Sequence, residues 1–66
     1  MSKPRLLRTV LQCYVNGEDV EVYEGNKGFI ERLWKTGCLW WSVESGKYVA
    51  SDYGVAVLAK MNKEVR

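Results

Sequence analysis

The sequence contains no histidine, and this absence excludes several kinds of chemistry. Without histidine there is no imidazole for acid–base catalysis, for a catalytic triad or for a zinc site. The two cysteines cannot supply the four ligands of a structural zinc ion by themselves. We therefore expect a protein that is not an enzyme, with no catalytic residue, no metal and no cofactor.

Long hydrophobic runs are missing as well. No apolar stretch approaches the roughly 18 residues that a membrane-spanning helix needs. The basic start is not followed by the apolar segment and the small-residue cleavage site of a signal peptide. We expect a cytoplasmic protein in which Cys13 and Cys38 stay reduced and pack as small apolar side chains. A disulfide between them is the alternative.

The residues that are present suit one small folded domain. The chain has 66 residues, of which 47% are hydrophobic, including three Trp and four Tyr. Such a composition is typical of a globular protein and not of a disordered one. The length leaves room for a single domain over residues 1–66, in which we expect residues 1–4 to be frayed.

Alternating apolar residues predict a hairpin in the first third of the chain. Apolar residues recur at a period of two over residues 5–15, which indicates a strand. Asn16-Gly17 is a strong signal for a two-residue hairpin turn, so residues 18–24 are predicted to be the return strand. In this register Tyr14 lies opposite Asp19 on a polar outer face.

The remainder of the chain predicts a second hairpin between two helices. Apolar residues at helical spacing indicate a helix over residues 27–36. Residues 38–43 and 47–51 are predicted to pair through a two-residue turn at Ser45-Gly46. A last helix is predicted over residues 53–62, with a buried strand as the alternative, because a short apolar run is ambiguous.

The predicted fold class is α+β, with an antiparallel sheet built from two hairpins and two short helices in ββαββα order. Asn26 is expected to cap the first helix, and Ser51 or Asp52 the second. The second hairpin turn is expected to place Trp41 opposite Ala50. The adjacent Trp40 and Trp41 then point to opposite faces of the sheet.

The charges are polarised along the chain, although the net charge is only +2. Four of the eight acids lie close together without a base among them, and several bases gather at the two ends. An acidic surface beside aromatic rings is typical of a protein-binding face, and a solvated surface is the alternative. The candidate partner-binding residues are Glu18, Asp19, Glu21, Glu24, Tyr14, Tyr23 and Trp40.

Two other functions remain open. A small nucleic-acid-binding protein would hold phosphates with basic side chains, although no motif of such a protein is present. A structural subunit would pair through an exposed strand edge. The candidate nucleic-acid-binding residues, on the first helix and near the end of the chain, are Lys27, Arg32, Lys35, Lys60 and Lys63.

In its short length, its lack of histidine and its acidic segment (Glu18, Asp19, Glu21 and Glu24), the chain resembles the small accessory proteins of bacteriophages and mobile elements, among them the anti-CRISPR proteins. The resemblance lies in size and charge character, without a shared motif. It implies a stoichiometric inhibitor that binds a CRISPR effector complex and occludes the place where target DNA or a nuclease subunit docks. The acidic face would then lie on basic residues that normally hold phosphates.

Overall fold

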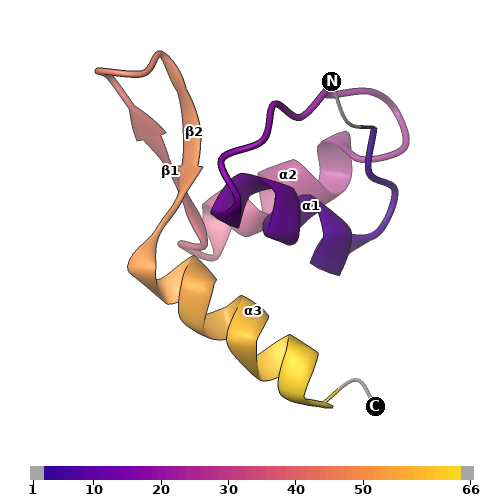
Figure 1. Cartoon of the computed structure of the whole chain (residues 1–66). Coiled ribbons are helices and arrows are strands. Elements are labelled where there is room, and N and C mark those ends of the chain that lie inside the picture. Colours follow the sequence, from indigo (N-terminus) through magenta and orange to yellow (C-terminus); the bar gives the residue numbers. More distant parts are fainter. Residues whose placement is uncertain (1–2, 65–66) are drawn as a thin grey trace.

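The computed structural model describes residues 3–64 as three helices and one β-hairpin (Figure 1). The predicted ββαββα order is therefore wrong, while the broader α+β class holds. Residues 1–2, part of the start that we expected to be frayed, lie outside the described residues. In chain order the elements are α1 (Leu7–Val15), α2 (Lys27–Lys35), β1 (Leu39–Ser42), β2 (Lys47–Ala50) and α3 (Asp52–Glu64).

The first element is a helix and not the predicted strand, because its apolar residues fit a helical spacing. Leu7, Val10, Leu11 and Tyr14 lie three or four residues apart, on one side of α1. Val10 and Leu11 have no exposed surface. In a strand, Val10 would point away from the apolar face. A strand would also place Thr9 on the same face as Leu7 and Leu11, whereas Thr9 is exposed.

The Asn16-Gly17 pair ends α1 instead of turning a hairpin. Gly17 has a φ of 75°, but Asn16 has a φ of −77°, so the pair does not form the predicted turn. The N–H of Gly17 donates to the carbonyl of Tyr14 at 3.2 Å, and the N–H of Glu18 donates to that of Cys13 at 2.9 Å. This is the Schellman motif of a helix end. The hairpin and the helix end thus share one sequence signal, a glycine with positive φ.

The α1–α2 loop (residues 16–26) is held by a buried asparagine. Asn26 is 1% exposed, and its amide nitrogen donates to the carbonyls of Pro4 at 3.0 Å and Glu21 at 2.9 Å. Its side-chain oxygen accepts the N–H of Tyr23 at 3.0 Å. The prediction that the side chain of Asn26 caps α2 is therefore wrong. Asn26 joins the start of the chain to the loop instead.

The predicted first helix and second hairpin are both present, as α2 and as β1–β2. The pairing differs by two residues, since Trp41 lies opposite Tyr48 and not opposite Ala50. The turn spans residues 43–46, which makes it longer than the predicted two-residue turn. A shift of two residues leaves every side chain on its predicted face, so Trp40 and Trp41 do lie on opposite faces.

The predicted last helix is present as α3, and the alternative of a buried strand is wrong. Ser51 caps α3, because its Oγ accepts the N–H of Gly54 at 3.0 Å. Gly54 is buried, and a Cβ atom at this position would collide with the carbonyl oxygen of Cys38. Only glycine therefore allows α3 to approach the base of the hairpin this closely.

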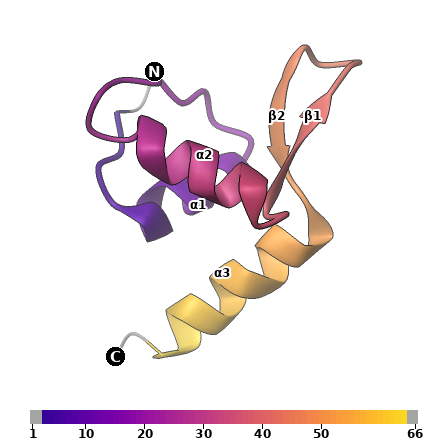
Figure 2. The same ribbon diagram turned by 180° about the vertical axis from the view of Figure 1, so that it is seen from behind.

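The core lies where the three helices meet the base of the hairpin, and the tip of the hairpin extends beyond it (Figure 2). Cys13 and Cys38 are both buried and not bonded to each other. Within residues 3–64 no helix has the length and apolarity needed to cross a membrane. The core residues come from every element except β2 and include the end of the α2–β1 connection: Val10, Leu11, Ile30, Leu33, Cys38, Leu39 and Leu58.

Candidate functional site

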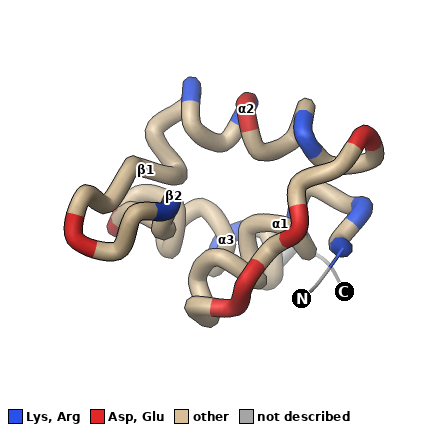
Figure 3. Tube along the Cα trace, turned by 90° about the horizontal axis from the view of Figure 1, so that it is seen from above, with Lys and Arg blue, Asp and Glu red and all other residues tan. Residues whose placement is uncertain are grey.

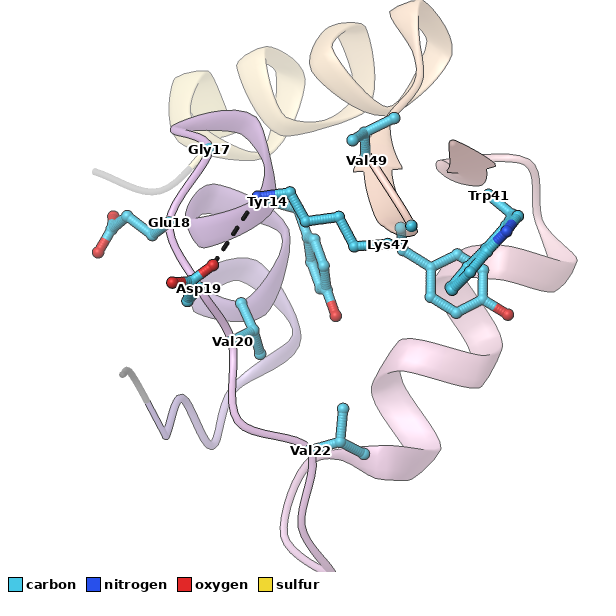
Figure 4. Close-up of a pocket in the computed structure, with 11 residues that line it drawn as sticks. Tyr14, Gly17, Glu18, Asp19, Val20, Val22, Trp41, Lys47 and Val49 are labelled. Atoms are coloured by element: carbon cyan, nitrogen blue, oxygen red, sulfur yellow. Dashed lines mark ion pairs between the residues drawn. The ribbon is translucent and has the colours of Figure 1, made fainter. Parts of the chain in front are cut away.

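An open groove of about 500 Å³ lies between the α1–α2 loop and the hairpin (Figure 4). Three aromatic side chains line it: Tyr14 from α1, Trp41 from β1 and Tyr48 from β2. Val20 and Val22 of the loop contribute to the opposite wall. We call this recess the aromatic groove. Its walls come from three separate parts of the chain, so only the folded protein contains it.

Two of the aromatic rings form a cross-strand pair. The ring centroids of Trp41 and Tyr48 are 5.1 Å apart, and the ring planes meet at 81°, which is an edge-to-face contact. Trp41 nevertheless remains 50% exposed. The pair is therefore held in a defined geometry while half of the indole surface faces solvent.

Tyr14 supplies the polar atom on the helical side of the aromatic groove. Its side chain is half-buried, and this burial raises the pKa of its hydroxyl above the ordinary value, with smaller contributions from Tyr48 and Cys13. The phenol is therefore neutral at physiological pH and can donate or accept a hydrogen bond.

Charged groups lie along the rim of the aromatic groove. Lys47 reaches from β2 to the loop, and its Nζ lies 3.8 Å from a carboxylate oxygen of Asp19 (Figure 4). The neighbouring Glu18 accepts a hydrogen bond from the side-chain amide of Asn16 at 3.2 Å. Both acids are exposed. The rim thus carries two carboxylates and one ammonium group.

The structure brings only part of the predicted partner-binding set to this groove. Tyr14, Glu18 and Asp19 line it. The predicted set lacked Trp41 and Tyr48. The sequence did hold a signal for them, because the predicted register and the observed register both place the two residues on one face of the hairpin. The predicted residues that lie outside the groove are Glu21, Glu24, Tyr23 and Trp40.

The acids of the loop have basic partners from distant and local parts of the chain. Glu21 lies 3.8 Å from the ammonium of Lys3, and Glu24 lies 3.1 Å from that of Lys27. Lys3 also lies 5.9 Å from the ring centroid of Tyr23, within the range of a cation–π contact. Exposed pairs of this kind contribute about 0–1 kcal/mol each. The loop is therefore a less acidic surface than its sequence indicates.

The candidate nucleic-acid-binding residues divide into two groups by their ion pairs. Basic and acidic residues both lie along α2 (Figure 3). Lys27 and Lys35 of α2 pair with acids, and Lys35 does so with Glu31 at 2.9 Å. The hydrogen bond from Lys35, together with its charge, lowers the pKa of Glu31. By contrast, Arg32, Lys60 and Lys63 form no ion pair with the other described side chains.

A second recess, of about 260 Å³, lies between the helices. Leu7 of α1, Arg32 of α2 and Met61 of α3 line it together with Tyr53. The guanidinium of Arg8 donates to the side-chain oxygen of Asn62 at 3.2 Å. Basic side chains of α1 and α2 thus lie close to the outer part of α3.

Among the described residues, no group of three or more acids or cysteines has a geometry that could hold a metal ion. The aromatic groove offers aromatic surface, two phenols and a charged rim, which are means of binding. Comparison of the chain with protein families, with curated proteins and with solved structures finds no match.

Proposed function

We propose that this protein is a non-enzymatic binding module that attaches to a protein partner through the aromatic groove. The observation that carries the proposal is the pair of Trp41 and Tyr48, held edge to face at 5.1 Å while Trp41 stays half-exposed. Tryptophan and tyrosine supply much of the binding energy of protein interfaces. A preorganised pair lowers the entropy that ordering these side chains costs on binding.

The surroundings of the pair have the composition of an interface. The valines of the loop wall provide apolar area, and Glu18, Asp19 and Lys47 provide a charged rim. An apolar centre with a polar rim is the usual arrangement in protein complexes. Trp40 is also 52% exposed, but it lies on the other face of the hairpin and outside the groove. The hairpin tip and the loop together are thus the proposed contact area.

We further propose that the partner is a bacterial defence complex, such as a CRISPR effector, and that the protein is its stoichiometric inhibitor in the host cytoplasm. The short chain and the acidic loop support this proposal. Glu18 and Asp19 line the same groove as the aromatic pair. A surface that normally holds nucleic-acid phosphates is basic, so it would complement these carboxylates.

The test is a binding assay with purified, nuclease-treated CRISPR effector complexes. We expect the protein to co-elute stoichiometrically with an effector and to prevent its binding to target DNA. Trp41→Ala should abolish both effects. Trp34→Ala is the matched control, because Trp34 is 49% exposed but lies on α2 outside the groove. If both variants lose binding equally, the aromatic groove is not the binding site. If no effector complex binds the protein, the proposed inhibitor function is wrong.

One observation favours nucleic-acid binding as a second function. The described bases without an acidic partner include Arg8, which binds Asn62 of α3, and Arg32, which lines the recess between the helices. Phosphate binding by such bases weakens steeply as salt rises. DNA retention at low salt that is lost in Arg32→Glu, but kept in Trp41→Ala, would assign this function to the helical side.

A further inference from the structure

We infer that the aromatic groove binds an arginine side chain of the partner, and that Lys47 occupies part of this binding site in the free protein. The inference rests on the proposed function and names the group that the groove recognises. It follows from three features of the groove: its aromatic walls, its carboxylates and the ion pair of Lys47 with Asp19.

The aromatic walls suit a planar cation. A guanidinium group stacks on aromatic faces and is more weakly hydrated than an ammonium group. In the edge-to-face pair of Trp41 and Tyr48, the ring that presents its edge keeps both of its faces uncovered by the other ring. Tyr14 lies across the recess, and its hydroxyl is an additional hydrogen-bond acceptor for a guanidinium N–H. The groove therefore offers stacking surface together with an acceptor.

The carboxylate of Asp19 completes the site. An arginine binds a carboxylate through two parallel N–H···O bonds, a geometry that a lysine cannot reproduce. The carboxylate is 74% exposed, so it is open to a partner, and Lys47 stands 3.8 Å away, at the outer limit of an ion pair. Such a pair is weak, because both groups remain hydrated. A guanidinium with better geometry can therefore displace the ammonium.

Lys47 already places one cation at the rim of the groove, beside Asp19. Its side chain extends from β2 toward the α1–α2 loop, where its Nζ lies 3.8 Å from a carboxylate oxygen of Asp19 (Figure 4). With Glu18 beside Asp19, the rim carries one negative charge more than Lys47 neutralises. A neutral apolar side chain could contact the same rings, but it would leave this charge without a partner. The charge of the ligand is therefore what distinguishes the two cases.

The experiment titrates the folded protein with the peptide acetyl-Gly-Arg-Gly-amide and follows amide and indole N–H resonances by NMR. The matched probe is the same peptide with citrulline, which has the shape of arginine without its charge. We expect the arginine peptide to shift the indole resonance of Trp41, which the Trp41→Phe variant identifies. We expect the citrulline peptide to bind at least about fivefold more weakly, since a charged partner strengthens a hydrogen bond about twofold in energy.

Two variants separate the roles of the charges. Asp19→Asn should lower the affinity for the arginine peptide to the affinity that the unsubstituted protein has for the citrulline peptide. Lys47→Gln should raise the affinity for the arginine peptide about two- to fivefold, because the exposed ion pair that competes for Asp19 is removed. Lys35→Gln is the control, since it removes the same charge from an exposed pair on α2. Unchanged resonances far from the groove establish that each variant is folded.

Each result has one meaning. If Lys47→Gln binds the arginine peptide no better than Lys35→Gln does, or if both peptides bind equally, the inference is wrong. If the peptides discriminate as expected while no effector complex binds the protein, the arginine site stands and the proposed inhibitor fails. If an effector binds through Trp41 while the arginine peptide does not bind, the proposed function stands and the arginine site fails.

Discussion

Leu39 and Trp41 lie two residues apart on the same face of β1, yet Leu39 is 2% exposed and Trp41 is 50% exposed. Leu39 belongs to the base of the hairpin, where the helices cover the strand. Trp41 lies toward the tip, where the strand has left the core and faces the aromatic groove. The comparison shows that the burial of a strand residue depends on what covers the strand, and not on how apolar the residue is.

The largest effect is expected from a truncation in the core. Leu11→Ala should lower the free energy of unfolding by about 3–4 kcal/mol, because it removes buried methyl groups and leaves a cavity. Denaturant unfolding followed by circular dichroism measures this loss. Leu6→Ala is the control, since Leu6 is 64% exposed, and its effect should stay within about 0.5 kcal/mol. Similar losses in the two variants would break the contrast between core and surface.

A second substitution tests the contact between α3 and the base of the hairpin. Gly54→Ala should cost about 2–3 kcal/mol, because the new Cβ meets the backbone of Cys38, which cannot rotate away. Gly28→Ala changes a helical glycine with open space around it and should be neutral or stabilising by up to about 1 kcal/mol. Thermal unfolding of both variants checks the difference in sign.

The buried amide of Asn26 is expected to come next. Asn26→Ala leaves the carbonyls of Pro4 and Glu21 and the N–H of Tyr23 without their partner, which should cost about 2 kcal/mol. Hydrogen exchange of the loop amides should rise more than that of α3. Asn62→Ala is the exposed counterpart and should leave both stability and exchange almost unchanged. A loop that stays protected in Asn26→Ala would contradict this role.

The groove is expected to respond differently from the core. Trp41→Ala should cost about 1–2 kcal/mol, from the buried half of the ring and its contact with Tyr48, while it removes partner binding. Leu39→Ala on the same strand face should cost more stability. Unfolding and binding measured on both variants therefore sharpen the comparison that opens this Discussion. A greater loss of stability in Trp41→Ala would overturn it.

The smallest effect concerns Tyr14 and alkaline pH. Burial raises the pKa of its hydroxyl in the folded state above the unfolded value of 10.0, so the folded state holds this proton more tightly. The resulting stability is fully present below pH 10 and declines as the pH rises through the folded pKa. Tyr14→Phe should show a shallower decline in unfolding free energy above pH 10. An identical decline in both proteins would mean that Tyr14 makes no such contribution.

The errors of the sequence-based fold have a common physical cause. Leu7, Leu11 and Tyr14 satisfy a helical spacing, whereas Leu7, Leu11 and Cys13 satisfy a strand spacing, so the local pattern permits both. The position that separates the two readings is Val10, and only its complete burial shows which face meets the core. Gly17 does not distinguish a helix from a hairpin, because a helix end and a hairpin turn both require a positive φ at this position.

The candidate site was predictable only in part, for the same reason. The acidic residues at the rim, Glu18 and Asp19, were evident as a cluster in the sequence, but their meeting with Lys47 spans residues far apart in the chain. Glu24 pairs locally with Lys27, whereas the pair of Glu21 with Lys3 joins distant parts of the chain and likewise offsets charge in the loop. Such pairing follows from tertiary packing, which charge counting along the chain does not include.

By itself the sequence determined the features that depend on near neighbours. These are the helix α2, the hairpin β1–β2 with its correct faces, the helix α3 with a cap at Ser51 or Asp52, and a composition without histidine chemistry. Only the tertiary structure decided that the first segment is helical, that Asn26 fastens the loop and that Trp41 remains exposed beside Tyr14. Local patterns set propensities, whereas burial and long-range contacts select among them, because most of the stabilising area is formed between elements.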